Sequence, residues 1–196
     1  MQVDVAGGMP GWEIVGLPDT SIREAKERVK IAIKNSGFEL ESRKIIINLA
    51  PADIKKEGSF FDLPIAIGVL LSINKIENKD LEKIVFVGEL SLDGKINKIN
   101  GILPMCIEAK KLGIEKIILP VDNAIEASVV DGIEIYGAKD LIQVVNFLNS
   151  KCKIPIYKTK LDEIFNKDNK CLCDFSEVKG QENVKRALEI AAAGRT

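Results

Sequence analysis

The chain has 196 residues, of which 46% are hydrophobic and 29% are charged, and its formal net charge is -1. This apolar fraction is enough for a sizeable core and excludes a disordered or collagen-like chain. The near balance of 28 basic and 29 acidic residues gives no global field that would attract nucleic acid or an anionic membrane. Any such binding must come from a local patch.

No stretch approaches the roughly 20 apolar residues that span a bilayer, and the start MQVDVAGGMPGW is not a secretory signal. We therefore predict a cytoplasmic protein with no membrane partner. The chain has no histidine, which removes the usual base of serine and cysteine nucleophiles. A zinc site would need all four cysteines, Cys106, Cys152, Cys171 and Cys173, and their irregular spacing predicts no metal site.

The first predicted strand is WEIVGL, which Pro18 ends. Ser21 and Glu24 have the spacing of a capping box and predict that a helix begins there, and Gly37 predicts its end. One buried face of this helix is indicated by Ile22, Ala25, Val29, Ala32 and Ile33. The run KIIINLA that follows is apolar on both faces, which predicts a central strand covered on both sides and ended by Pro51.

The second half alternates strands and helices. KIVFVGEL predicts a buried strand, and Asp93-Gly94 predicts a hairpin between two extended runs. A helix is expected over 103–112 and stops at Gly113. The remaining elements are strands in KIILP and IEIYG and helices in DNAIEASVV, capped by Asp122 or Asn123, and in KDLIQVVNFLN. Residues 1–150 thus read as an α/β domain with a mixed sheet.

Residues 151–173 have alternating charges and no sustained period, which predicts a linker. A second unit is predicted over 174–196, where a helix carries Val184, Ala187, Leu188 and Ala191 on one face. A lone helix of this length has nothing to cover that face. We therefore expect it either to dock on the first domain or to open a further domain.

Four strings resemble the N-terminal region of the magnesium-chelatase-like AAA+ ATPases, the YifB or ComM family. They are EIVGLPDTSIREAKERVKIAIKNSGFE, INLAPADIKKEGSFFDLPIAIG, FVGELSLDGKINKINGILP and YGAKDLIQVVNFLN. The resemblance implies a Lon-peptidase-like domain, of the ribosomal protein S5 domain 2-like fold, a linker, and the first helix of an AAA+ motor led by Gly180-Gln181-Glu182. The chain would then be a fragment that lacks part of an N-terminal strand, which leaves a sheet edge open for association, and that ends before the Walker A motif.

The same resemblance implies a function for the intact protein. It would be an ATP-dependent motor, a hexameric ring that moves branched DNA during recombination in natural transformation, with this domain as a binding or regulatory module beside its own motor. ATP and magnesium would be needed by the intact protein, and no cofactor by this fragment. Val178, Gly180 and Gln181 would lie near the adenine as a partial site.

Lon-type peptidases carry a catalytic serine and lysine, and the resemblance places these positions at Phe60 and Leu103. Neither side chain can attack a carbonyl or take up a proton, so we predict no catalytic residues. Ser59 precedes the position of the catalytic serine by one residue. We expect Ser59 or Asp62 to cap the following helix, with Pro64 in its first turn and Phe60 and Phe61 as packing residues.

Two other functions remain open. A peptidase could use Ser59 with Lys55, Lys56 or Asp62, and the intact protein could instead be a metal-insertion motor like magnesium chelatase.

Five basic residues share the first helix and could face a phosphate backbone: Arg23, Lys26, Arg28, Lys30 and Lys34. Glu24 and Glu27 are interleaved with them, and no exposed aromatic residue is evident for base stacking. We therefore interpret this surface as a solvated helix face.

Overall fold

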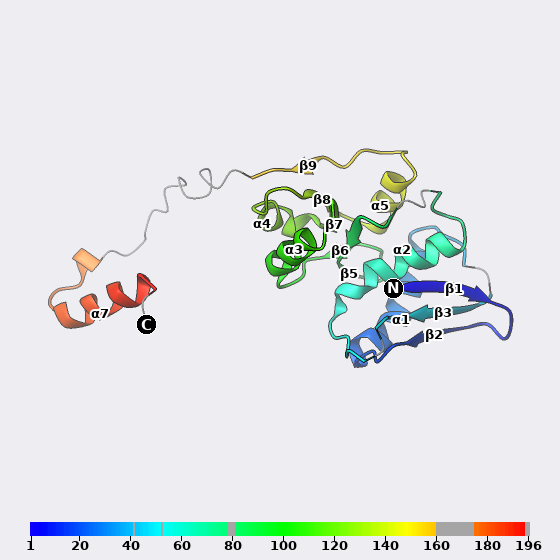
Figure 1. Ribbon diagram of the computed structural model, residues 1–196, viewed down its shortest axis with the longest axis horizontal. Helices are drawn as coiled ribbons and strands as arrows, with labels where there is room; N and C mark the ends of the chain where they lie inside the picture. The colour runs from blue at the N-terminus through cyan, green and yellow to red at the C-terminus, as the bar shows by residue number, and fades with distance from the viewer. Residues whose placement is uncertain (41, 52, 78–80, 160–174, 195–196) are drawn as a thin grey trace. The chain divides into compact units, whose positions relative to one another are not determined.

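In the computed structural model the chain forms two compact units, residues 1–160 and 161–196. The structure describes residues 1–40, 42–51, 53–77, 81–159 and 175–194 (Figure 1). The strands are β1 (Gln2–Ala6), β2 (Gly11–Val15), β3 (Lys44–Asn48), β4 (Ile84–Phe86), β5 (Glu89–Leu90), β6 (Ile96–Asn97), β7 (Lys116–Pro120), β8 (Glu134–Ala138) and β9 (Ile156–Tyr157). The helices are α1 (Thr20–Asn35), α2 (Asp62–Ser72), α3 (Ile102–Lys111), α4 (Ala124–Ala127), α5 (Leu141–Leu148) and α7 (Glu182–Ala192), and the 3-10 turns are η1 (Ser59–Phe61), η2 (Val121–Asn123) and η3 (Phe175–Glu177).

The predicted α/β fold class with a mixed sheet is confirmed. A three-stranded sheet has the order β1-β3-β2, with β1 antiparallel and β2 parallel to the central β3. Ile45 and Ile47 of β3 are fully buried, whereas the alternate residue Ile46 is only half-buried. The central position predicted for KIIINLA is therefore correct, and one face of the strand is covered more completely than the other.

Helix α1 has the buried face that its apolar spacing predicts, and Gly37 follows its end with a φ of +82°. The predicted capping box is wrong, because the capping residue is Asp19. Its carboxylate accepts hydrogen bonds from the N–H of Ile22 at 2.8 Å and from the N–H of Gly58 at 3.2 Å. Asp19 therefore caps α1 and ties it to the loop that precedes η1.

The second sheet has the order β4-β7-β8-β9, and β5 and β6 form the hairpin predicted at Asp93-Gly94. The single strand predicted for KIVFVGEL is divided at Gly88, so that β4 joins the sheet and β5 joins the hairpin. A Cβ at Gly88 would lie 2.5 Å from the Ile96 side chain. The chain can turn there only because Gly88 lets the hairpin approach so closely.

Helix α4 lacks the side-chain cap that was predicted from Asp122 or Asn123. The Asn123 side chain is fully buried and instead bonds the backbone of Ile99, with both its donor and its acceptor at 2.9 Å. The asparagine thus satisfies the backbone N–H and carbonyl groups of a loop that is distant in sequence. A local sequence pattern cannot indicate such a partner.

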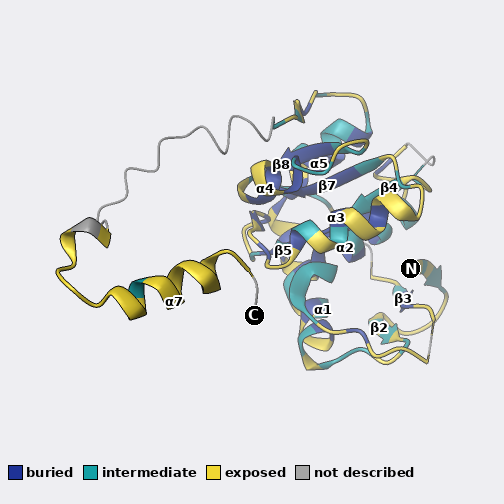
Figure 2. Ribbon diagram, turned by 60° about the vertical axis from the view of Figure 1, so that its left-hand side comes forward, coloured by how far each residue is buried: buried dark blue, intermediate teal, exposed yellow. Residues whose placement is uncertain are grey.

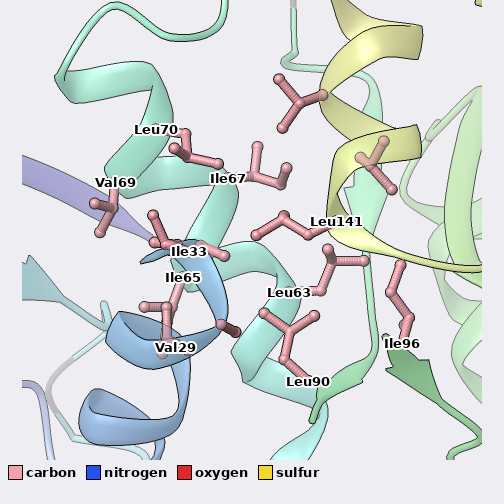
Figure 3. Packing of buried hydrophobic residues seen from close by; sticks show 14 of the residues in the cluster. Val29, Ile33, Leu63, Ile65, Ile67, Val69, Leu70, Leu90, Ile96 and Leu141 are labelled. Atoms are coloured by element: carbon pink, nitrogen blue, oxygen red, sulfur yellow. The ribbon is translucent and has the colours of Figure 1, made fainter. Parts of the chain in front are cut away.

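Two hydrophobic clusters form the core of the first unit. One joins α1, α2, β3 and α5, and Figure 3 shows Val29 and Ile33 of α1 meeting Ile65 and Val69 of α2. The other joins α3, α4, β7 and β8 and includes Cys106, which is fully buried as expected. Helix α2 contributes residues on most of its circumference to the first cluster, so it is the central helix of the unit.

The first unit extends into the predicted linker. Ile154 is buried in the first cluster, and the short strand β9 pairs antiparallel with β8. Residues 151–159 therefore belong to the first unit, and the rest of the predicted linker, 160–173, lies outside the described residues.

The second unit contains η3 and α7, and Figure 2 shows α7 exposed along nearly its whole length. Val184, Leu188 and Ile190 of α7 are each about half exposed. No helix in the described parts of either unit is long and apolar enough to cross a membrane.

Replacing Gly16 by alanine is expected to lower the free energy of unfolding by at least about 2 kcal/mol. Gly16 has a φ of +102°, and a Cβ there would lie 2.2 Å from the carbonyl oxygen of Leu49 in the backbone beyond β3. Gly37→Ala is the matched control, because Gly37 has a φ of +82° and open space around its Cβ position. Urea unfolding of both variants measures the difference, and equal losses would show that the close approach to Leu49 contributes nothing.

Candidate functional site

The turn η1 forms the corner where the resemblance places a catalytic serine. Phe60 occupies that position and stacks on Phe61, with ring centroids 4.6 Å apart. Phe61 packs against the first hydrophobic cluster and Phe60 against the second. Both rings also line a groove of about 700 Å³ between α2 and β4. The corner is therefore apolar and joins the two halves of the core.

Ser59 is half-buried, and within the described part of the chain its hydroxyl is hydrogen-bonded to no lysine or carboxylate. Lys55 pairs with Glu57 at 2.6 Å, and the Lys56 ammonium group donates to the carbonyl oxygen of Pro51. Asp62 is bound to Arg28. Each group that could have served Ser59 as a base is engaged elsewhere.

The start of α2 differs from the prediction, because neither Ser59 nor Asp62 caps the helix with its side chain. The N–H of Leu63 donates instead to the carbonyl oxygen of Gly88 at 3.0 Å. Pro64 does lie in the first turn, as expected. The loop between β4 and β5 therefore takes the place of a local capping residue.

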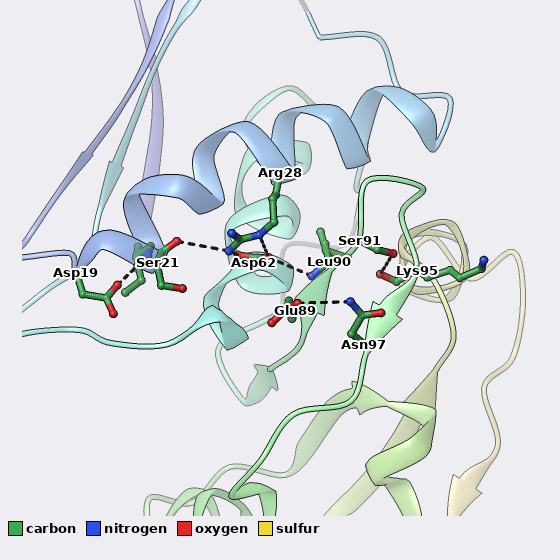
Figure 4. A network of polar contacts seen from close by, with 10 residues as sticks. Asp19, Ser21, Arg28, Asp62, Glu89, Leu90, Ser91, Lys95 and Asn97 are labelled. Carbon is green, nitrogen blue, oxygen red and sulfur yellow. Dashed lines mark hydrogen bonds and ion pairs between the residues drawn. The ribbon is translucent and has the colours of Figure 1, made fainter.

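Arg28 of α1 and Asp62 of α2 form the principal charged contact between these helices (Figure 4). The guanidinium group binds the carboxylate through two hydrogen bonds, Nε to Oδ2 at 3.0 Å and Nη2 to Oδ1 at 3.1 Å. Asp62 has no exposed surface, and the N–H of Leu90 in β5 also donates to Oδ2 at 3.2 Å. The carboxylate thus receives bonds from both α1 and β5.

Burial and hydrogen bonding shift the pKa values of both Asp62 and Arg28. Burial raises the pKa of Asp62 above its usual range, while the hydrogen bonds from Arg28 and Leu90 oppose the rise. The hydrogen bond to Asp62 raises the pKa of Arg28, which stays charged. The arrangement is closed by bonds within the protein and is a structural pair, not a site for a reacting molecule.

Leu103, where the resemblance places the catalytic lysine, is the second residue of α3 and is half-buried. The same helix carries Cys106, whose pKa burial raises to about 11, so that its thiol is protonated and unreactive at neutral pH. Of the other cysteines, Cys152 donates its S–H to the carbonyl oxygen of Gln143, and Cys171 and Cys173 lie outside the described residues. The absence of a metal site stays a prediction.

The residues predicted to lie near an adenine belong to the second unit. Val178, Gly180 and Gln181 are all exposed, and Gly180 and Gln181 have φ values of +70° and +61°. This turn lies at the start of α7, with Gln181 as the residue that precedes the helix. It cannot by itself enclose a nucleotide, and the adenine contact stays a prediction.

Sequence reasoning missed the pairing of Arg28 with Asp62, because it grouped Arg28 with the solvated basic residues and treated Asp62 as a cap. One signal was available. Asp62 directly precedes the apolar run LPIAIGVLL, and a carboxylate at the end of a buried run needs a cationic or hydrogen-bonding partner.

Comparisons with known proteins give the chain relatives over its whole length. The family model of subunit ChlI of magnesium chelatase matches residues 1–123. The chain is 40% identical over 196 residues to the competence protein ComM of Haemophilus influenzae and 41% identical over 194 residues to the uncharacterized protein YifB of Escherichia coli. These matches cover 100% and 99% of this chain but only 38% and 37% of the relatives.

A weaker similarity links the chain to a peptidase. It is 30% identical over 147 residues to Lon protease 2 of Bacillus subtilis, a match that covers 71% of this chain and 26% of the protease.

Replacing Arg28 by methionine is expected to lower the free energy of unfolding by about 3 kcal/mol at pH 7, because it leaves the Asp62 charge buried without its partner. Without the guanidinium the pKa of Asp62 rises further. Between the ordinary pKa of an aspartate in the unfolded chain and the raised pKa of Asp62 in the folded variant, the folded state holds a proton that the unfolded state releases. The stability of the variant therefore falls as the pH rises through this range.

Arg23→Met is the matched control, since Arg23 is exposed on the same helix and should change stability by no more than about 0.5 kcal/mol. Urea unfolding at pH 5 and pH 8 should show a smaller loss for Arg28→Met at the lower pH. Losses that are equal for the two arginines, or independent of pH, would contradict the assignment of a buried pair.

Proposed function

Because this chain belongs to the magnesium-chelatase ChlI family, together with ComM and YifB, we propose that it is the N-terminal binding or regulatory part of an ATP-dependent motor. The motor itself would act on branched DNA during recombination or competence. The observation that carries the proposal is the similarity to the competence protein ComM over the whole of this chain.

The share of the relatives that the chain spans supports a role as one part of a larger machine. It spans 38% of ComM and 37% of YifB, so more than half of each relative lies outside the match. ATP hydrolysis and DNA movement belong, in this proposal, to that remaining part. ATP and magnesium would bind there, and Val178, Gly180 and Gln181 would supply at most one side of the adenine site. A ring of six copies would be the working assembly.

The apolar corner at η1 supports a non-proteolytic role for the first unit. Phe60 replaces the serine and Leu103 the lysine that Lon-type peptidases use, and neither side chain can hold or transfer a proton. Ser59 is adjacent, but its hydroxyl contacts no base in the described part of the structure. The unit would therefore bind a partner or regulate the motor instead of cutting peptide bonds.

A second candidate function is metal insertion, because the matching family model is described as a subunit of magnesium chelatase. In that case the intact protein would hydrolyse ATP in response to a tetrapyrrole and a partner subunit, and DNA would have no effect. The two candidates share the motor and differ in its substrate.

Replacing Ser59 by alanine is expected to leave peptide cleavage at the background level of the unmodified chain. The measurement is turnover of a fluorogenic casein or peptide mixture by both proteins, with an active Lon peptidase as the positive control. Cleavage by the unmodified chain that Ser59→Ala abolishes would establish a peptidase and reject the non-proteolytic role.

A polypeptide extended past Thr196 to include the motor is expected to hydrolyse ATP, and branched DNA is expected to accelerate it severalfold. Phosphate release is measured with branched DNA, with linear duplex of the same composition, and with a tetrapyrrole; the present chain is the control without a motor. Stimulation by tetrapyrrole and not by DNA would favour the chelatase-like function, and no response to branched DNA would overturn the DNA motor.

A further inference from the structure

The basic residues of α1 are interleaved with acidic ones in sequence, but on the helix they separate. At about 100° per residue, Lys26, Lys30, Arg23 and Lys34 fall within an arc of about 80°. Glu27 borders this arc about 20° beyond Lys34, and Glu24 lies about 60° beyond Glu27. We call the four cations the basic stripe. The buried residues Ile22, Val29 and Ile33 fall within an arc of about 40° that ends about 20° from Lys26. The stripe therefore runs along one border of the buried face, where Arg23, Lys30 and Lys34 are exposed.

Arg28 does not belong to the stripe, although sequence reasoning had grouped it there. Figure 4 shows its side chain leaving α1 toward Asp62, where it is held by two hydrogen bonds. One of the five basic residues is therefore used in a structural ion pair, and the other four form the basic stripe.

Within the part of the chain that the structure describes, three of the four cations are not paired with an acid. Within the described residues, Lys30 and Lys34 form no ion pair, and both are exposed. Lys26 lies 3.7 Å from Glu27, and Arg23 donates to the carbonyl oxygen of Pro18 at 3.3 Å while remaining exposed. Lys30 and Lys34 therefore carry charge that no acidic side chain among the described residues neutralises through an ion pair.

The surface beside Lys30 and Lys34 is hollowed. A recess of about 590 Å³ is lined by these lysines together with Gly37, Phe38, Glu39 and Leu40. Phe38 also packs against the first hydrophobic cluster, and this packing holds its ring in place at the side of the recess. Glu39 is the acidic group of the lining, and two lysines exceed its charge. The recess is large enough for a sugar and its phosphate next to the stripe.

We infer that the basic stripe binds the phosphate backbone of nucleic acid. From Arg23 to Lys34 the helix rises about 16 Å, a length over which duplex DNA presents about ten charges. A row of cations along one helix face complements such a continuous line of anions, whereas a single small anion would contact at most one or two of them. The inference rests on the proposed function, since it identifies the surface through which the N-terminal part would meet the DNA.

The geometry favours nucleic acid over an acidic protein segment. The stripe has Glu27 at one border, so a partner must follow a narrow line of positive charge, as an extended phosphate backbone does. Binding should also weaken with salt, because contacts to phosphates release counterions. The logarithm of the binding constant should fall with the logarithm of the salt concentration, with a slope of about 0.7 to 0.9 for each phosphate contacted.

The test is binding of labelled single-stranded and duplex oligonucleotides to the unmodified 196-residue chain by fluorescence anisotropy over a range of salt concentrations. Lys30→Gln/Lys34→Gln is expected to weaken binding about tenfold and to reduce the salt slope by about 2. Lys110→Gln/Lys111→Gln on α3 removes the same charge and should change affinity less than about twofold. Glu24→Gln/Glu27→Gln should tighten binding, because it removes repulsion at the border of the stripe.

All these residues are exposed, so thermal unfolding should be unchanged and a loss of binding will report contact instead of folding. Three results would each overturn the inference. The unmodified chain could fail to bind, the two lysine double variants could lose affinity equally, or polyglutamate could fully displace the DNA at equal charge. The outcome is separable from that of the motor experiment: DNA-stimulated ATP hydrolysis without binding through the stripe rejects only this inference, and binding without stimulation rejects only the proposed function.

Discussion

The contact between Arg28 and Asp62 is the constraint from which the arrangement of the first unit follows. Burying a carboxylate completely is costly unless its charge is met, and here a bidentate guanidinium and the N–H of Leu90 meet it together. These bonds hold α1, α2 and the β5–β6 hairpin in one geometry. The apolar faces of α1 and α2 then pack against each other over Val29, Ile33, Ile65 and Val69 (Figure 3). Apolar burial supplies the driving force, and the charged pair adds a directional contact between α1 and α2.

The corner at η1 is built from two aromatic side chains that serve packing. Nucleophilic catalysis needs a hydroxyl, a base and a path for the proton, and the side chains of Phe60 and Leu103, where the resemblance places the catalytic serine and lysine, supply none of these. The stacked rings of Phe60 and Phe61 instead connect the two hydrophobic clusters. The position where the resemblance places a catalytic serine is thus used for packing. The same two rings line the apolar groove between α2 and β4.

Charge in this protein acts locally. With a net charge of -1, the chain as a whole neither attracts nor repels a polyanion. Helix α1 sorts its charges by face, so that Arg28 turns to the core, the acidic residues gather on one flank, and the basic stripe occupies the other. One helix can therefore stabilise the fold on one side and present a line of positive charge on another, because its periodicity gives the two roles different residues.

By itself the sequence determined the elements whose pattern is local: the buried face of α1, the central strand β3, the hairpin at Asp93-Gly94 and the helix within KDLIQVVNFLN. Apolar periodicity and turn residues act over only a few positions. It also determined the family, through strings that run the length of the chain. Only the tertiary structure decided which polar groups meet. Arg28 and Asp62 are 34 residues apart, Leu63 is capped by Gly88, Asn123 bonds Ile99, and Gly88 divides one apolar run between two sheets. Each of these contacts depends on how distant segments are brought together by burial, and no pattern within one segment carries that information.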